Sequence, residues 1–91
     1  MSVKIRVPAQ LRTLTGGAGE VAVDGATVGE ALKALDAAHP GFGERLFDET
    51  GQLRRFVNVF VSDEDVRFLD GLATPVAEGQ TVSIVPAVAG G

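Results

Sequence analysis

The last six residues, Pro86 to Gly91 ("PAVAGG"), have the composition best suited to chemistry in this 91-residue chain. They follow a β-prone run, "TVSIV" (81–85), and end in two glycines. Glycine has no side chain and adopts any backbone conformation, so a glycine end can enter a narrow channel. Six extended residues reach roughly 20 Å at about 3.3 Å each. We therefore predict that the Gly91 carboxylate reacts in another protein's active site. The tail that enters the partner's channel is Pro86, Ala87, Val88, Ala89 and Gly90. The alternative is a frayed, idle end.

Other residues that could do chemistry lack the partners that chemistry needs. The chain has no cysteine and one histidine, which excludes thiolate sites and histidine clusters, and we predict no metal site. The acids of "SDED" (62–65) read as a solvated turn, and His39 reads as a structural residue at a helix end. "TGG" (15–17) lacks the lysine and spacing of a phosphate-binding loop. Without a nucleophile, base or cofactor motif, the chain reads as a binding or carrier module and not as an enzyme.

The composition is that of one globular domain. Hydrophobic residues make up 45% and charged residues 22% of the chain. The formal net charge of −4 disfavours a nucleic-acid partner. No apolar run is long enough to cross a bilayer, and the first residues, "MSVKIRVP", do not form a signal peptide. We therefore expect a cytoplasmic protein without a membrane partner.

The apolar pattern predicts an α+β fold with the order β-β-α-β-(β)-β. The helix is expected over 27–39, where Thr27 and Glu30 form a capping box and an apolar face runs from Val28 to Ala38. Residues 41–47 are expected to form an irregular lid that packs Phe42, Leu46 and Phe47, and 48–52 a polar loop. A turn or short helix is expected over 9–17. Strands are expected at 3–7, 20–25, 55–61, 66–69 and 81–85.

Strand alternation places two apolar side chains on the solvent side of the sheet. If Val82 and Ile84 point inward, then Ser83 and Val85 point outward. The same rule directs the valines of 55–61 inward and Phe56, Asn58 and Phe60 outward. Phe60 and Val85 are thus candidates for a partner-docking patch beside the root of the tail, with Arg6 at its rim. The alternative is that the segment 42–53, or another loop, covers both.

Two stretches point to a known family. "RFVNVFVSDEDVRF" (55–68) and the "VPAVAGG" end (85–91) resemble the MoaD/ThiS family of ubiquitin-like sulfur-carrier proteins, with the strongest resemblance to the CysO-type carriers. The resemblance covers essentially the whole chain. It implies a ubiquitin-like β-grasp domain over 1–85, with a mixed sheet and one main helix on one face, followed by a flexible, extended Gly-Gly tail over 86–91.

The resemblance also implies a mechanism. An E1-like activating enzyme using Mg-ATP would adenylate the Gly91 carboxylate, and a sulfur donor would displace AMP to leave a C-terminal thiocarboxylate. The carrier itself would bind no cofactor and act as a co-substrate of its partners. The implied sulfur acceptor is a cysteine synthase or a secondary-metabolite sulfur-transfer enzyme, with a metalloprotease that releases the product. By position, Phe60, Val85 and Arg6 match the family's docking patch, with valine at 85 where several relatives have phenylalanine.

Three other functions stay open. The chain could be the small subunit of a molybdopterin synthase, although "DETGQLRR" and "SDEDVR" favour a CysO-type carrier. It could be a protein modifier that forms isopeptide bonds through Gly91. It could also be a plain interaction module with an idle tail, in which case deletion of Gly91 would leave its activity intact.

Overall fold

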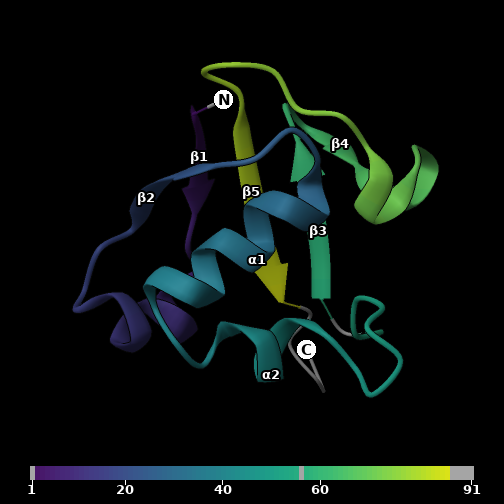
Figure 1. Cartoon of the computed structure of the whole chain (residues 1–91). Coiled ribbons are helices and arrows are strands. Elements are labelled where there is room, and N and C mark those ends of the chain that lie inside the picture. Colours follow the sequence, from purple (N-terminus) through teal and green to yellow (C-terminus); the bar gives the residue numbers. More distant parts are fainter. Residues whose placement is uncertain (1, 56, 87–91) are drawn as a thin grey trace.

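The computed structural model describes residues 2–55 and 57–86, and its centre is one mixed sheet (Figure 1). The strand order is β2-β1-β5-β3-β4, in which β1 and β5 run parallel and the other neighbours antiparallel. The strands are β1 (Ser2–Arg6), β2 (Glu20–Asp24), β3 (Val57–Val61), β4 (Glu64–Asp65) and β5 (Thr81–Pro86). The predictions for Phe56 and for residues 87–91 lie outside the described residues.

Helix α1 (Val28–Ala38) packs across one face of this sheet (Figure 1). The Thr27 hydroxyl accepts a hydrogen bond from the Glu30 N–H at 3.2 Å, which confirms the predicted cap. The Glu30 carboxylate in turn accepts from the Ala26 N–H, one residue before the expected partner. The helix buries Val28, Ala31, Leu32 and Leu35. Ala38 is exposed, so the predicted apolar face extends one turn too far.

The segment after α1 is more regular than predicted. Residues 42–46 form a short helix, α2 (Phe42–Leu46), instead of an irregular lid. Phe42 and Leu46 are completely buried, and Phe47 packs against the core. Because these side chains fill space under α1, they anchor the segment on the helix side of the sheet. The segment 9–17 contains the 3-10 helix η1 (Ala9–Thr15), in agreement with the predicted turn or short helix.

The predicted strand at 66–69 is wrong. Val66–Phe68 form a 3-10 helix, η2, and the short strand β4 lies just before it, within the acidic run that was expected to be only a turn. The Asp65 carboxylate accepts a hydrogen bond from the Arg67 N–H at 2.8 Å. This local bond offers the backbone an alternative to a strand ladder. A further 3-10 helix, η3 (Gly71–Ala73), follows.

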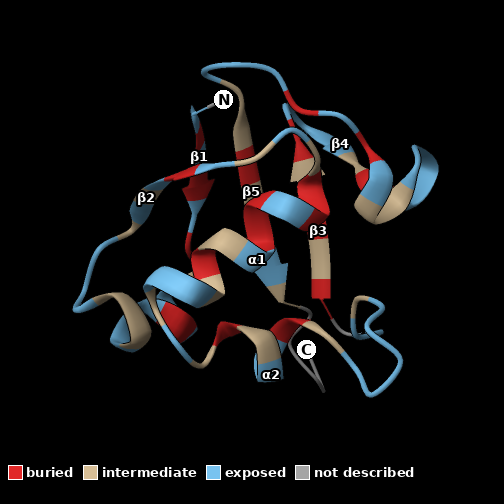
Figure 2. Cartoon of the chain, viewed as in Figure 1, coloured by how far each residue is buried: buried red, intermediate tan, exposed pale blue. Residues whose placement is uncertain are grey.

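The register of β3 and β5 confirms the predicted inward faces. Val59 lies opposite Ile84 and Val61 opposite Val82, and each of these four side chains is buried. They meet the buried face of α1 in one core, which Figure 2 shows as red segments on facing elements. A mixed five-stranded sheet with one main helix on one face is the ubiquitin-like β-grasp fold. None of the helices within the described residues is long and apolar enough to span a membrane.

Candidate functional site

The tail begins at the middle of the sheet. Strand β5 extends one residue beyond the predicted end, and Pro86 pairs with Val57 of β3. Because β5 lies between β1 and β3, the chain leaves the sheet from its centre and not from an edge. The other residues predicted to enter a partner's channel, 87–91 with the reacting Gly91, lie outside the described residues and stay predictions.

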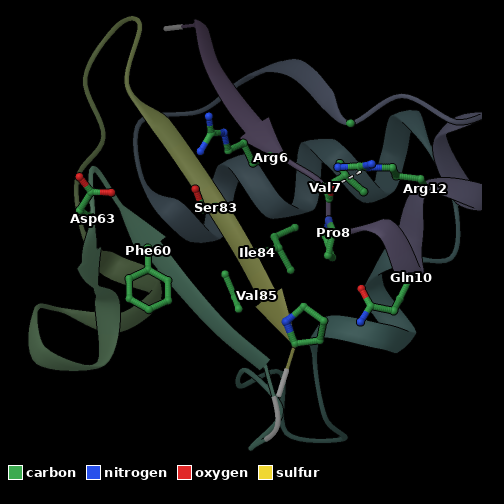
Figure 3. A pocket seen from close by; sticks show the side chains of 12 residues that line it. Arg6, Val7, Pro8, Gln10, Arg12, Phe60, Asp63, Ser83, Ile84 and Val85 are labelled. Atoms are coloured by element: carbon green, nitrogen blue, oxygen red, sulfur yellow. Dashed lines mark hydrogen bonds between the residues drawn. The ribbon is translucent and has the colours of Figure 1, made fainter. Parts of the chain in front are cut away.

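The sheet face opposite α1 presents the predicted docking residues. Arg6 of β1 lies beside Ser83 of β5, and Ser83 lies beside Phe60 of β3, so these side chains form one row across three strands. Val85 is two residues beyond Ser83 on the same face and is 45% exposed. Phe60 is its diagonal neighbour, within reach for an aromatic side chain. Figure 3 shows the Phe60 ring and Val85 on adjacent strands, with α1 behind the sheet.

The alternative that segment 42–53 covers this face is wrong. Its apolar side chains Phe42 and Leu46 are buried in the core under α1, while Val85 stays exposed. The docking face is instead hollowed into a groove of about 760 Å³. Its lining includes all three predicted docking residues and the root of the tail, Pro86.

Residues outside the strands also line this groove, and the sequence pattern did not predict them. Arg12 and Gln10 belong to η1, and Asp63 belongs to the turn between β3 and β4. The Arg12 Nε–H donates to the Val7 carbonyl at 3.1 Å, which folds the guanidinium back toward the end of β1 (Figure 3). A side chain at Gly19 would come within 3.2 Å of that guanidinium. Glycine at position 19 leaves room for this guanidinium, but no sequence pattern links Gly19 to Arg12.

The groove differs in charge from the rest of the chain. Within the described ranges 2–55 and 57–86, Arg6 and Arg12 line it together with one acid, Asp63, whereas the whole chain carries a formal charge of −4. Aromatic and arginine side chains are enriched at protein interfaces. An apolar strip formed by Phe60 and Val85, with arginines on one side, is suited to contact with another protein.

Two polar residues outside the groove take part in local hydrogen bonds. The His39 N–H donates to the Leu35 carbonyl and ends α1. The Asp48 carboxylate accepts bonds from the Thr50 hydroxyl, the Thr50 N–H and the Gln52 N–H, and these bonds close the loop 48–52. The Thr50 hydroxyl is the main cause of a lowered pKa at Asp48. Within the described residues, no three histidine or acidic side chains gather as a metal site would require.

Comparison with known proteins identifies the family. The model of the ThiS family matches residues 5–91. This chain belongs to the ThiS family. Over 93 residues, and over the full length of both chains, this ThiS-family protein is 50% identical to the sulfur carrier protein CysO of Mycobacterium tuberculosis. It is also 43% identical over 68 residues to small archaeal modifier protein 3 of Haloferax volcanii, with 75% of this chain and 73% of the relative covered.

A solved structure agrees with this assignment. The ThiS-family chain superimposes on a chain of the Amycolatopsis orientalis BexX/CysO complex with a TM-score of 0.92 and 48% identity, covering 98% of this chain and 99% of the other. The β-grasp fold predicted from the resemblance is thereby confirmed. The family match extends across the docking residues and through Gly91.

Proposed function

We propose that this protein is a sulfur carrier that delivers sulfur from a thiocarboxylate formed at Gly91. The observation that carries the proposal is 50% identity, over the full length of both chains, to the sulfur carrier protein CysO. The docking groove at the root of the tail supports it, because a carrier without catalytic groups must be held by the enzymes that act on its end. The protein itself acts as a co-substrate.

The proposed reaction starts with activation of a poor electrophile. An oxygen of the Gly91 carboxylate attacks the α-phosphorus of Mg-ATP in the activating enzyme, and pyrophosphate leaves. In the acyl adenylate formed, AMP is a good leaving group. The donor is sulfur at the sulfide level, hydrosulfide: its sulfur attacks the carbonyl carbon, the C–O bond to AMP breaks, AMP departs, and loss of the S–H proton leaves a thiocarboxylate on Gly91 with no change of oxidation state. This sulfur is a soft nucleophile that attacks an electrophilic carbon in the acceptor's site.

Each part of the carrier has a separate task in this proposal. Phe60 and Val85 bind the activating enzyme through their exposed apolar surface, and Arg6 contributes charge at the rim. Pro86, paired in the sheet, fixes where the tail starts. The small residues from Ala87 to Gly90 pass through the channel, where glycine gives clearance.

We propose a cysteine synthase or a secondary-metabolite sulfur-transfer enzyme as the acceptor, with a metalloprotease for release. The CysO-type relative and the BexX/CysO complex support the view that such a carrier works by assembling with other proteins. Because activation consumes ATP, we propose the cytoplasm as its location.

Intact mass spectrometry tests the proposal. The carrier is incubated with Mg-ATP, a sulfur donor and the activating enzyme of the same organism. The expected gain matches replacement of one oxygen by sulfur, and a variant lacking Gly91 serves as the control. An unchanged mass, with an activating enzyme that is competent on another carrier, would contradict the proposal.

A second candidate function is protein modification. The 43% identity to small archaeal modifier protein 3 favours it, because the same activated Gly91 could be attacked by a lysine amine instead of a sulfur donor. A ladder of conjugates in lysate, absent for the variant without Gly91, would support this function. Formation of a thiocarboxylate without any conjugates would support the carrier function and count against protein modification.

A further inference from the structure

A second apolar surface lies away from the docking groove. Phe68 is 86% exposed and the adjacent Leu69 is 40% exposed. Both stand at the end of η2, in the outer turn that Figure 2 colours largely pale blue beside β4. Exposure of a phenylalanine to this degree leaves most of its apolar surface in water, at a cost of about 25 cal/mol for each Å². The stability of the fold therefore does not explain a phenylalanine at position 68.

The turn that presents Phe68 is held in place by its neighbours. Val66 is completely buried, and its carbonyl accepts a hydrogen bond from the Leu69 N–H at 2.9 Å. The Arg67 guanidinium donates to the Asn58 side chain at 2.8 Å and to the Val57 carbonyl at 2.7 Å. These bonds tie the turn to β3, so Phe68 is displayed on a fixed backbone and not on a loose loop.

The far side of the turn is fixed through a buried threonine. Thr74 is 5% exposed, and its hydroxyl accepts from the Asp70 N–H at 3.0 Å. The Thr74 carbonyl accepts from the Val28 N–H at the start of α1. The surface around Phe68 is therefore anchored to the sheet on one side and to the main helix on the other. A preorganised surface loses little entropy when a partner binds.

This surface is hollowed and acidic. A groove of about 530 Å³ runs beside Phe68 and Leu69, and among the residues that the structure describes its lining includes Glu64 and Asp70 but no lysine or arginine. The nearest cation in the sequence, Arg67, directs its guanidinium to Asn58 and to backbone carbonyls. Apolar side chains flanked by carboxylates are complementary to an apolar side chain flanked by lysine or arginine.

The second surface lies far from the root of the tail. Gln80, next to the first residue of β5, lines its groove, whereas Pro86 at the other end of β5 lines the docking groove. Six strand residues span about 20 Å at 3.3 Å each. Figure 1 likewise shows the segment after β4 beside the end of the sheet opposite to the one where β5 ends. The two grooves approach each other only at the β3–β4 turn, where Asp63 lines the docking groove and Ser62 and Glu64 line the second groove.

We propose that Phe68, Leu69, Glu64 and Asp70 form a second docking surface for a partner protein. Its segment inserts an apolar side chain into the groove and places lysine or arginine side chains against the two carboxylates. The inference rests on the proposed function only in the choice of proteins used to test it. It predicts an interaction that does not require the tail to react.

The test is calorimetric titration of two proteins from the same organism, the activating enzyme and the sulfur-accepting enzyme, with the full-length carrier at low and high salt. We expect Phe68→Ser to weaken binding to at least one of them by about tenfold or more, as loss of an aromatic anchor does. The double variant Glu64→Lys, Asp70→Lys should weaken the same complex, most strongly at low salt, because screening reduces the charge contribution. Phe68→Leu is the matched control and should retain most of the affinity.

Two further measurements keep the result interpretable. Val85→Ser changes the other groove, so it shows whether the binding assay detects loss of a docking contact. Sedimentation of the wild-type carrier should show a monomer, and a dimer lost in Phe68→Ser would overturn the proposal in favour of self-association. Unchanged affinity of Phe68→Ser and of the charge-reversed variant for both enzymes would also overturn it. The mass assay for the thiocarboxylate is independent of these titrations, so failure of the proposed function is seen separately.

Discussion

Substitution of Phe60 by aspartate separates docking from folding. Phe60 is half-buried on the open face of β3 and lines the groove at the root of the tail. A carboxylate at this position stays hydrated in the free carrier, because the face opposite α1 is open (Figure 3). We therefore expect a loss of stability of about 1 kcal/mol, from the apolar surface removed. In the complex with the activating enzyme, the same carboxylate replaces an aromatic contact and is itself taken out of water.

The expected effect on activation is larger than the effect on the fold. Loss of an aromatic anchor at an interface costs about 1–3 kcal/mol. At 1.4 kcal/mol for each factor of ten, this gives a roughly 5- to 140-fold higher KM for the carrier. The kcat at saturation should change little, because Phe60 contributes to binding and not to the chemical step. ATP–pyrophosphate exchange measured over a range of carrier concentrations gives both constants.

Ala22→Asp is the matched control. Ala22 is exposed on the same face, since it pairs with the outward Lys4 of β1, but it lies on the edge strand β2. It is three strands from β3, about 14 Å at the usual strand spacing. This variant should activate like the wild type. Equal KM values for Phe60→Asp and wild type would refute the docking role. An unfolded Phe60→Asp, judged by urea denaturation, would show that Phe60 belongs to the core.

Three further predictions concern stability. Asp63 has a φ of 76° in the hairpin turn, which is unfavourable for a residue with a side chain. Asp63→Gly should raise the free energy of unfolding by about 0.5–1 kcal/mol. Glu64→Gly, one residue later in β4, is the control and should lower it. A lower urea midpoint for Asp63→Gly than for the wild type would contradict this prediction. Thr27→Ala removes the cap of α1 and should cost about 1 kcal/mol in urea unfolding, and an unchanged midpoint would count against the cap. The lowered pKa of Asp48 means that its loop is fully stabilised above its ordinary value of 3.8 and loses that stabilisation as pH falls through the folded-state pKa. The Thr50 amide signal in an acid NMR titration should therefore shift at a pH below 3.8. A transition at or above that value would refute the stabilising hydrogen bonds from Thr50 to the Asp48 carboxylate.

The alternating strands were predictable because their pattern reflects burial directly. In 57–61 and 81–85 aliphatic residues recur at every second position and face α1, and Val85, which follows Ile84 directly, falls on the outer face by the same alternation. The same rule placed Phe60 and Val85 on the outer face without knowledge of the sheet order. The capping box at Thr27 was predictable for a similar reason, since its bonds join residues only three or four apart.

The stretch after β3 could not be predicted from local pattern. "VRFL" has the composition of a strand, but the Asp65 bond to the Arg67 N–H and the Arg67 bonds to β3 turn it into a 3-10 helix. The long-range bonds join residues 9 to 13 positions apart, so nothing within the stretch itself indicates them. The consequence is an exposed Phe68, which strand alternation would have assigned to one face of the sheet.

The docking groove was half predictable. Its floor is made of strand residues, which alternation identifies. Its walls come from η1 and from the hairpin turn, whose side chains are placed by tertiary contacts such as the bond from Arg12 to Val7. No periodicity relates Arg12 or Asp63 to Phe60, so their convergence is visible only in the folded chain.

The central claim, that Gly91 carries the sulfur, is tested most directly by tandem mass spectrometry of the carrier after activation. Sulfur should replace one oxygen in the C-terminal fragment containing Gly91 and in no other fragment. This thiocarboxylate should disappear when the sulfur-accepting enzyme and its co-substrate are added. Sulfur found elsewhere in the chain, or a thiocarboxylate that persists in the presence of the acceptor, would contradict the role of Gly91 as the sulfur carrier.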